Sequence, residues 1–595
     1  MDLDWAQAGV AGNHEWAQES LVGSIRNWRR EMSSRAYRGV SILIALVLIG
    51  ALLVGCAAPA PTPTAAPTTA PAAPTAAAAP TKAPAPAPTA AAAPATKPKI
   101  VVALDSDLDD LEPTFFKTDA AYYAVANTYQ ALLREQYKPE NNGQVLMGTL
   151  KFEGDGAESI TYSADGKTAI FKIRKGMKFT NGAEVNAKSF KYGIDRALKG
   201  PGYLASLLEL GGVTDPNQIT VKDDYTLEIS CPQKTPMFES LFAFEVIPAM
   251  DEATSKAHAT EKDPWGTAWY KTNVVGSGPY ILKDWKPGEQ YTLEPNPNYW
   301  SGADYFKNSG IVVKLIPNPQ DRELLLKSGA IDLALGLPFK DVDELKKDPK
   351  VNVIEIPYSR VRFLGWNNKI KPFDNVKVRQ ALSYAVPYDT ILSKAVYGHG
   401  RPARSIIPSD FPTSDQNYSP YKTDPAKAKA LLKEAGVTSF DTELAVRLSI
   451  PEDVEAATWI QSAFAEVGVN VKVNKMTDAQ FFDKLNKHEL ALFIHDWYSW
   501  LHDPFYQFNW LCRTGQATNY VDYSNPKFDD LFKAGLYEQD PKKRADISVQ
   551  MQHIWLDDAP WAPLYHPNWI IGTSPTFKGF AVPFSLCLDY APMTK

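Results

Sequence analysis

The order of hydrophobic and polar positions between residues 443 and 494 predicts five consecutive elements. Alternating or continuous apolar residues, typical of strands, occupy positions 443–450, 469–473 and 490–494. Between them, positions 453–466 and 478–487 carry apolar residues at helical spacing. A β-α-β-α-β succession of this kind is typical of a parallel sheet with right-handed crossovers. Ligands of such open sheets bind beyond the carboxyl ends of the strands.

Two segments rich in charged and aromatic residues follow predicted strands at that edge of the sheet. The first runs from residue 450 to residue 453. The second, residues 495–504, contains three aromatic residues, two histidines and two carboxylates within ten positions. The sequence therefore predicts a binding site here. Its candidate ligand contacts are Glu452, Asp453, Trp497, Tyr498, Trp500 and Asp503.

Two other interpretations of residues 495–504 remain open. Large aromatic side chains pack in cores more often than they contact ligands, so the tryptophans are also consistent with the core of a lobe. The histidines and aspartates have the chemistry of metal ligands, but one segment rarely supplies a complete coordination shell. These four residues are His495, Asp496, His502 and Asp503. We therefore expect no bound metal ion and no other cofactor.

The N-terminal region has the three-part pattern of a secretory signal. Arginines between residues 26 and 38 precede an uncharged apolar run that ends in Leu-Val-Gly-Cys at residues 53–56. This ending resembles the bacterial lipobox, whose cysteine carries the membrane lipid, so we expect lipidation of Cys56. The signal would be complete if translation began at Met32. The alternative is an uncleaved transmembrane anchor at residues 39–55. Both interpretations place the rest of the chain outside the cytoplasm, because the arginines hold the N-terminal side in the cytoplasm.

Composition divides the remaining chain into a spacer and a globular region. Residues 57–99 consist only of Ala, Pro, Thr and Lys. Such a segment cannot bury enough apolar surface to offset the entropy lost on folding, so we expect a disordered tether. Residues 100–595 have an ordinary globular composition and a length that suggests two or three domains. The net charge of −6 and the lack of a basic stripe argue against nucleic-acid binding.

The cysteines and the motifs that the sequence lacks argue for a binding function. Beyond Cys56 the chain contains Cys231, Cys512 and Cys587, with a spacing unlike that of a zinc site, and we expect buried free thiols. The sequence has no Gly-x-Ser-x-Gly elbow, no complete phosphate-binding loop and no His-Glu-x-x-His. We therefore expect a protein that is not an enzyme.

A longer pattern runs through the globular region in a fixed order. In its most specific part, residues 163–182, Asp165-Gly166 and Asn181-Gly182 predict tight turns on either side of an alternating strand, and a helix follows at 187–197. Shorter matches include Gly-Ser-Gly-Pro-Tyr at 276–280 and Asn-Pro-Asn-Tyr-Trp at 296–300. Others follow at 328–332, 376–382, 424–425, 519–520, 523–526 and 558–560. On these motifs residues 100–595 resemble the family 5 extracellular solute-binding proteins of ABC importers, which include oligopeptide, dipeptide, nickel and cello-oligosaccharide binders.

The resemblance implies a bilobed α/β fold of the periplasmic-binding-protein type, in its large type II form with three subdomains and a hinge between the lobes. A solute would be enclosed as the lobes close and be delivered to the permease and ATPase subunits of an importer. We expect a monomer. The expected division is a signal region (1–56), the tether (57–99), lobe I (100–133, 271–358 and 566–595), an additional subdomain of lobe I (134–270) and lobe II (359–565).

Two departures from the family pattern bear on the ligand. Family members that hold a peptide by its free amine have an Asp three residues before an Asp/Glu-Pro pair, and here that position is Trp500. Dipeptide binders place an arginine after the strand that ends near residue 450, and here Glu452 and Asp453 follow instead. Both charge anchors of a dipeptide site are therefore missing from the positions that the family uses.

Other side chains suit several kinds of ligand. The aromatic segment suits a sugar ring or a cation over an aromatic face. Arg360 and Arg362 suit an anionic group of the ligand, because they come just before residues 363–367, which in the family run near the cleft. The alternative is that both arginines lie on a solvated face of a strand. We expect a peptide held largely by main-chain hydrogen bonds. An oligosaccharide, a small organic cation, and a role as ligand sensor for a membrane receptor remain alternatives.

Overall fold

The computed structural model describes residues 97–595. The predicted signal region, the lipidation candidate Cys56, the start at Met32 and the tether up to residue 96 lie outside the described residues. Within residues 97–595, no helix has both the length and the apolar composition needed to cross a membrane.

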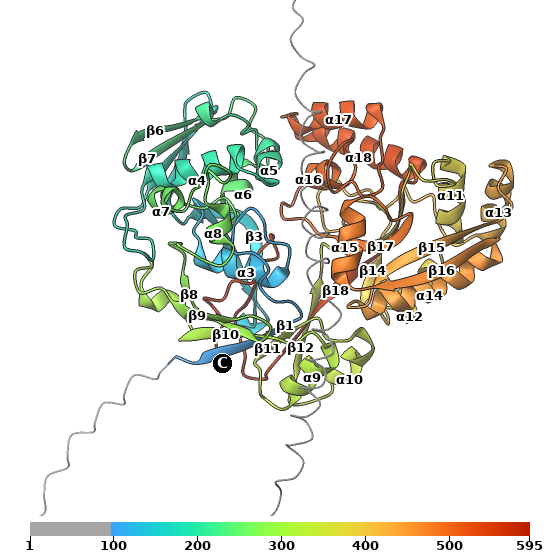
Figure 1. Cartoon of the computed structure of the whole chain (residues 1–595), viewed down its shortest axis with the longest axis horizontal. Coiled ribbons are helices and arrows are strands. Elements are labelled where there is room, and N and C mark those ends of the chain that lie inside the picture. The colour runs from blue at the N-terminus through green and yellow to red at the C-terminus, as the bar shows by residue number, and fades with distance from the viewer. Residues whose placement is uncertain (1–96) are drawn as a thin grey trace, which may run out of the picture. The chain divides into compact units, whose positions relative to one another are not determined.

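One long strand, β18 (Trp561–Thr573), holds the largest sheet of the described region together. The strand order is β16-β15-β17-β13-β18-β11-β1-β10-β9-β8, and β12 and β14 also pair with β18. The first part of β18 pairs with β13 (Val361–Trp366) and β14 (Gly400–Pro402). Its last part pairs with β11 (Leu333–Leu335) and β12 (Asn352–Pro357). The two halves of this part of the chain therefore meet in β18 (Figure 1).

We name the two halves after the part of β18 with which their strands pair. Lobe I denotes residues 97–357 and 568–595, and lobe II denotes residues 361–567. The chain passes between them at residues 358–360 and again in the middle of β18. This arrangement confirms the predicted bilobed α/β fold, whereas the lobe and subdomain boundaries expected from the sequence stay a prediction.

Lobe I is built around β1 (Lys99–Leu104), which lies parallel to β10 (Gly310–Leu315) and β11. The antiparallel strands β9 (Gln290–Pro295) and β8 (Tyr280–Lys286) extend this half of the sheet. After Lys99, β1 consists of apolar residues and most of them are buried, as expected for a central strand covered on both faces. The associated helices are α3 (Asp119–Thr128), α9 (Pro319–Lys327) and α10 (Val342–Leu345).

Two smaller sheets complete lobe I. One joins β2 (Leu133–Glu140) and β3 (Val145–Gly154) to the C-terminal strand β19 (Phe580–Val582). The other is antiparallel, with the order β4-β5-β7-β6. Its strands are β4 (Ala157–Tyr162), β5 (Thr168–Ile173), β6 (Ile219–Asp223) and β7 (Thr226–Ser230). The neighbouring helices are α4 (Ala187–Lys199), α5 (Leu204–Leu210), α6 (Phe238–Phe242), α7 (Glu252–Ala257) and α8 (Thr267–Tyr270).

The segment that identified the family folds as the pattern predicts. Gly166 and Gly182 have φ of 71° and 89°, the left-handed conformation that tight turns require. Phe190 and Ile194 form the buried stripe of α4, which begins with a capping box. These residues support the fold of lobe I.

Lobe II contains the predicted β-α-β-α-β unit. It consists of β15 (Phe440–Arg447), α14 (Pro451–Glu466), β16 (Val469–Met476), α15 (Asp478–Asn486) and β17 (Leu492–Trp497). β15 is parallel to both β16 and β17, as predicted. The other helices are α11 (Val376–Ala385), α12 (Tyr388–Lys394), α13 (Pro425–Glu434), α16 (Pro504–Leu511), α17 (Pro526–Leu536) and α18 (Pro541–Asp558).

One predicted boundary is wrong in a way that matters for the site. The sequence predicts that the last strand ends at residue 494, but β17 continues to Trp497. Antiparallel pairing with β13 extends it, because Val361 and Arg362 lie opposite Trp497 and Asp496. His495, Asp496 and Trp497 are therefore strand residues, and the connecting segment starts at Tyr498.

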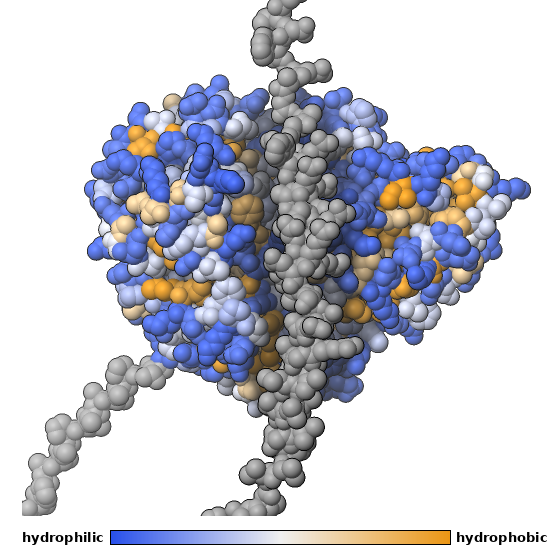
Figure 2. All heavy atoms as spheres, viewed as in Figure 1, coloured by the Kyte–Doolittle hydropathy of each residue, from blue (hydrophilic) through white to orange (hydrophobic). Residues whose placement is uncertain are grey.

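The cysteines and the surface complete the description. Cys231, Cys512 and Cys587 are buried and free, which confirms the prediction for the described part of the chain. On the face shown in Figure 2, hydrophilic residues cover most of both lobes and apolar residues form scattered patches.

Candidate functional site

The aromatic segment after β17 reaches from lobe II to lobe I. Tyr498 is the first residue after the strand. Its hydroxyl donates a hydrogen bond to the carboxylate of Asp119, 3.0 Å away at the start of α3. The predicted binding segment therefore lies at the contact between the lobes.

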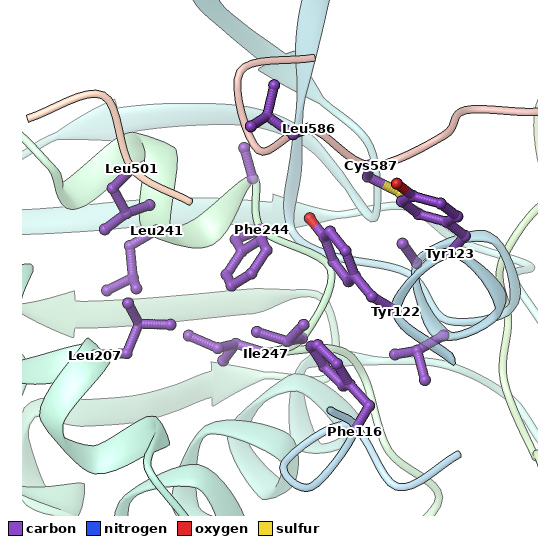
Figure 3. Close-up of a cluster of buried hydrophobic side chains, with 14 of the residues drawn as sticks. Phe116, Tyr122, Tyr123, Leu207, Leu241, Phe244, Ile247, Leu501, Leu586 and Cys587 are labelled. Carbon is purple, nitrogen blue, oxygen red and sulfur yellow. The ribbon is translucent and has the colours of Figure 1, made fainter. Parts of the chain in front are cut away.

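Trp500 packs into a group of aromatic rings that lobe I supplies, which we call the aromatic box. The ring centroids lie between 5.2 and 6.0 Å from that of Trp500 and belong to Phe116, Tyr122, Tyr203 and Phe244. Such aromatic pairs contribute about 0.5–1.5 kcal/mol each beyond the area they bury. Figure 3 shows Phe116, Tyr122 and Phe244 in one buried cluster with Leu501 of lobe II. Trp500 is thus an inter-lobe contact, not part of a core confined to lobe II.

A group of charged side chains, which we call the arginine cluster, lies where β13 begins and β15 and β17 end. Its members are Arg360, Arg362, Arg447, Asp119, Asp453 and Asp496. Most of its members are buried, and Arg360 and Asp119 are partly exposed. Arg362 contacts Asp453 at 3.0 Å and Asp496 at 3.1 Å. Arg360 contacts Asp496 at 2.9 Å and Asp119 of lobe I at 3.7 Å. Arg447 also donates to Asp496.

Strand register explains why these charges meet. Arg362 in β13 and Asp496 in β17 are opposite one another in an antiparallel pair. Arg447 is the last residue of β15, and Asp453 lies in the first turn of α14 that follows. Arg360 lies in the short link between β12 and β13, where the chain passes from lobe I to lobe II.

The pKa values in the cluster follow from burial and pairing. Burial opposes ionisation of Asp496, but Arg362, Arg360 and Arg447 hold its pKa well below the usual value. For Asp453, burial prevails over its arginine neighbours and raises the pKa to about 6. Asp496 is therefore the permanently charged centre of the cluster.

The cluster changes the interpretation of the two predicted arginines. Arg362 is 3% exposed, which excludes a solvated strand face. Its charge is already balanced by Asp453 and Asp496, and Glu452 lies 3.7 Å from it. Arg360 stacks over the ring of Tyr498, 4.8 Å from its centroid, and joins carboxylates of both lobes. Both arginines thus have partners within the protein.

The remaining residues of the aromatic segment have partners of their own. Asp503 caps α16 by accepting a hydrogen bond from the Phe505 amide, and it pairs with both terminal nitrogens of Arg544 in α18 at 2.8 and 2.9 Å. His495 packs among aromatic rings, and burial lowers its pKa to about 3. Trp497 is a half-buried strand residue. Because Asp496 and Asp503 are each paired with arginine, these residues do not assemble the metal site considered from the sequence.

A cavity of about 440 Å³ lies in lobe I beside Trp500. Its walls come from β2, β3, residues 240–245 after the start of α6, residues 299–307 and the C-terminal residues 583–592. The volume falls within the roughly 300–1,000 Å³ typical of small-molecule sites. Trp500 lines it together with Phe244 of the aromatic box. The inter-lobe contact therefore borders a cavity of ligand size.

Carboxyl groups are the most frequent charged groups in the cavity wall. They belong to Glu135, Glu153, Asp155, Glu245 and Asp589, whereas the basic groups are Arg134 and Lys307. Burial raises the pKa of Glu245 to about 8 and also raises the pKa of Asp155 and of Asp589. The thiol of Cys587 also lines the cavity, and burial raises its pKa well above the usual value, so it is not activated as a nucleophile.

Sequence reasoning missed this cavity. Arg134, Glu245 and Asp589 lie in widely separated parts of the chain and belong to no local motif. Only the return of the C-terminal segment to pair with β3 brings Asp589 near the other two.

Comparisons with known proteins agree with this architecture. Residues 151–519, more than half of the chain, match the sequence model of the bacterial extracellular solute-binding proteins, family 5 (middle). The probable D,D-dipeptide-binding periplasmic protein of Escherichia coli K12 is 30% identical over 490 residues, which cover 81% of this chain and 91% of that protein. The glutathione-binding protein of Escherichia coli K12 is 27% identical over 495 residues, covering the same shares.

Solved structures show the same fold. An ABC transporter-associated periplasmic binding protein from Helicobacter pylori, in complex with the peptide STSA, aligns with a TM-score of 0.74 at 23% identity and covers 83% of this chain and 97% of its own. A dipeptide-binding protein from Pseudoalteromonas in complex with Met-Leu gives a TM-score of 0.74 at 22% identity and covers 84% and 100%. The chain belongs to the family 5 bacterial extracellular solute-binding proteins, the solute-capturing components of ABC importers, and it is a binding protein and not an enzyme.

Proposed function

We propose that this protein captures a peptide or peptide-like solute in the cavity beside Trp500 and delivers it to the permease and ATPase subunits of an ABC importer. The observation that carries the proposal is the position of the segment after β17. Tyr498 and Trp500 of lobe II contact Asp119 and the aromatic box of lobe I next to a cavity of about 440 Å³. Closure of the lobes would thereby enclose the solute.

The names of relatives support a peptide. The two Escherichia coli relatives are described as binding a D,D-dipeptide and glutathione, and both structural neighbours hold peptides. In this chain, Trp500 occupies the position of the expected amine anchor, and Arg362 is paired with Asp453 and Asp496. We therefore expect main-chain hydrogen bonds and aromatic contacts to hold the peptide.

Among the residues predicted to bind ligand, we assign the direct contact to Trp500, which lines the cavity. Tyr498 and Arg360 contact Asp119 of lobe I and stabilise the closed form. The others hold the site in place through contacts within lobe II: Trp497, Glu452, Asp453, Arg362 and Asp503.

The lobes would close by bending of the chain at the two places where it passes from one lobe to the other. Residues 358–360 and the middle of β18 are the positions at which a hinge would bend. A solute drives closure only if it binds the closed form more tightly than the open form. The contacts of Trp500 with lobe I belong to the closed form.

We further propose that a lipid on Cys56 tethers the protein to the outer side of the membrane. The support is the Leu-Val-Gly-Cys sequence after an apolar run. Cys56→Ser should abolish incorporation of a radioactive fatty acid, and equal labelling of variant and wild type would refute the tether.

Calorimetry with Trp500 variants tests the binding site. The probes are D-Ala-D-Ala, glutathione and the peptide Ser-Thr-Ser-Ala. For a peptide that binds, Trp500→Ala should weaken binding by about 1–3 kcal/mol, the scale of burying one large apolar side chain. Trp500→Asp should weaken binding of a neutral ligand more, because the carboxylate is buried without a partner, yet it should favour a peptide with a free amine.

The matched control is Trp459→Ala. Trp459 lies on α14 of lobe II, and its indole donates to Glu455, away from the cavity. This variant should change the melting temperature without changing the affinity. An unchanged affinity in Trp500→Ala, together with a large drop in melting temperature, would place Trp500 in a purely structural role. Binding of oligosaccharides with no binding of peptides would replace the peptide by a sugar.

A further inference from the structure

Glu245 is a half-buried residue of the cavity wall. Its Oε2 atom is buried and has no hydrogen-bond partner. The other four acidic residues of the wall each accept at least one hydrogen bond or ion pair. Glu135 binds two backbone amides, Glu153 binds Arg134, and Asp589 binds the amide of Ala591. A buried polar atom without a hydrogen bond is unfavourable, so Glu245 is the carboxyl group in this wall that a cationic ligand group would satisfy. The hydroxyl of Tyr129, Nη1 of Arg134 and Nε1 of Trp500 are also buried in this wall without a partner.

Asp155 offers a second free acceptor in the same wall. It is 8% exposed and takes hydrogen bonds from Gln130, Tyr299 and Trp300, all three on Oδ1, at 3.1, 2.9 and 3.0 Å. Its Oδ2 receives none of them. The carboxylate is therefore held firmly by one oxygen while the other stays available.

The basic groups of the wall do not balance these carboxyls. Arg134 is paired with Glu153 at 2.8 Å and lies over the ring of Trp300. Its charge lowers the pKa of Asp155 and of Asp589, but burial prevails and raises both. Lys307 is exposed and donates to the carbonyl oxygen of Asp304 at 3.0 Å. The interior of the cavity consequently has an excess of acidic groups, which disfavours an anionic ligand group and favours a cationic one.

The aromatic rings of the wall suit the same charge. Phe244, Tyr299, Tyr305 and Trp500 line the cavity. Aromatic faces attract ammonium and guanidinium groups, and more strongly where water is excluded. Because Trp500 comes from lobe II, opening of the lobes would remove one wall and give a charged group access to Glu245.

We propose that this cavity is the subsite for a positively charged group of the solute, an ammonium or a guanidinium, bound by Glu245 with Asp155 and Asp589. The solute is accordingly a basic peptide or another organic cation. The assignment rests on the proposed function, since it assumes that the lobes close over the solute at Trp500.

Binding of a cation should release a proton. Burial raises the pKa of Glu245 to about 8, and Asp589, Asp155 and Glu135 add to the effect. The other titratable groups of the wall are Glu153, Arg134, Lys307, Cys587, Tyr129, Tyr137, Tyr299 and Tyr305. At pH 7 the ligand-free Glu245 is mostly protonated. A cation beside it lowers its pKa, so Glu245 ionises on binding.

The first experiment compares ligands that differ only in charge. Calorimetry measures binding of di- and tripeptides that carry one arginine, placed at each position in turn. Each arginine peptide is compared with a peptide that has citrulline at the same position. The same peptides are also measured with an acetylated N-terminus. We expect at least one arginine peptide to bind about tenfold or more tightly than its citrulline partner, the scale of a charge-assisted hydrogen bond. Loss of affinity on acetylation alone would assign the subsite to the α-amine, and loss on the citrulline exchange would assign it to a side chain.

Two variants locate the effect. Glu245→Gln should remove the preference for charge, whereas Glu239→Gln should keep it. Glu239 lies in α6 of the same lobe, and its carboxylate accepts a hydrogen bond from the hydroxyl of Tyr162 at 2.6 Å. If Glu245→Gln does not fold, proton release by the wild-type protein decides. Calorimetry at pH 7 in buffers of different ionisation enthalpy measures this release. Binding of an arginine peptide should release protons, and binding of a citrulline peptide should not.

A pair of small probes separates this inference from the peptide function. Thermal shift and NMR titration compare butylguanidine with butylurea, which have the same shape and different charge. Binding of butylguanidine alone, lost in Glu245→Gln, would support the cation subsite even if no peptide binds. Peptide binding without any preference for charge would overturn the subsite and leave the peptide function standing. Equal behaviour of the two small probes and of all peptide pairs would overturn the subsite as well.

Discussion

The arginine cluster and the cavity place two sets of buried charges close to the segment after β17, and only the first set is balanced by the protein itself. In the cluster, Asp496 contacts three arginines, and its pKa lies well below the usual value. In the cavity, the Oε2 atom of Glu245 has no hydrogen-bond partner, and burial raises the pKa of this carboxyl to about 8. In the cluster the arginines and carboxylates pair with one another, and in the cavity wall five carboxyl groups face two basic groups.

This difference separates a structural role from a binding role. Buried ion pairs are costly to break, because removal of one partner leaves the other charge without compensation. An unpartnered buried carboxyl is already costly in the free protein. The sequence makes the arginine cluster look like an anionic-ligand site, but in the structure its charges pair with one another, whereas in the cavity wall the carboxyl groups outnumber the basic groups.

The largest effect should come from breaking the arginine cluster. Arg362→Met should lower the free energy of unfolding by about 3–5 kcal/mol, because it leaves Asp453 and Asp496 buried with one cation fewer. Chemical denaturation at pH 7 measures the change. The deficit should shrink between pH 7 and pH 5, since Asp453, with a pKa of about 6, becomes neutral as the pH falls.

The matched control for this variant is Arg404→Met. Arg404 is an exposed residue of lobe II, and an exposed substitution of this kind changes stability by about 0.5 kcal/mol or less. Equal stability of the two variants would show that the cluster contributes nothing to the fold and would remove the contrast with the cavity.

A smaller change of opposite sign should follow from Glu245→Gln. The folded-state pKa of Glu245, about 8, lies above that of an exposed glutamate, so the ligand-free protein loses stability as the pH rises from about 4.5 to 8. Glutamine does not titrate, so the variant should be more stable than wild type by about 1–3 kcal/mol at pH 7, where one unit of pKa corresponds to about 1.4 kcal/mol.

Denaturation curves of Glu245→Gln and wild type at pH 5, 7 and 8.5 check this. The gap between the two proteins should widen as the pH rises. A variant that is less stable than wild type at every pH would mean that Glu245 has a partner and that the cavity resembles the cluster.

The smallest effect concerns the contact between the lobes. Tyr498→Phe removes the hydroxyl that donates to Asp119, a loss of about 1 kcal/mol. Because this bond joins the lobes, the closed form should lose stability and the affinity for a bound peptide should fall about fivefold, as measured by calorimetry.

Tyr418→Phe provides the comparison. The Tyr418 hydroxyl also donates to a carboxylate, that of Asp557, but both residues lie in lobe II. This variant should leave the affinity unchanged. A similar loss of affinity in both variants would show that the hydroxyl of Tyr498 has no special role in closure.

Local patterns predicted much of lobe II. The β-α-β-α-β unit around residues 440–497 follows from the spacing of apolar residues, since each helix and strand buries one face against its neighbours. The boundary error at β17 has a long-range cause, because its last residues pair with β13, more than a hundred residues earlier. The aromatic segment was predicted to bind ligand from its composition alone, and its contact with lobe I was not predictable from its own residues.

The sequence alone determined the family, the bilobed α/β class and the composition of the segment that joins the lobes, because these depend on motifs and periodicities within short stretches. The tertiary structure decided which charges are satisfied. Tyr498 meets Asp119 across 379 residues of chain, and β19 brings Asp589 to the wall that contains Glu245. Whether a buried charge has a partner depends on groups that are distant in sequence and close in space, and no local pattern records them.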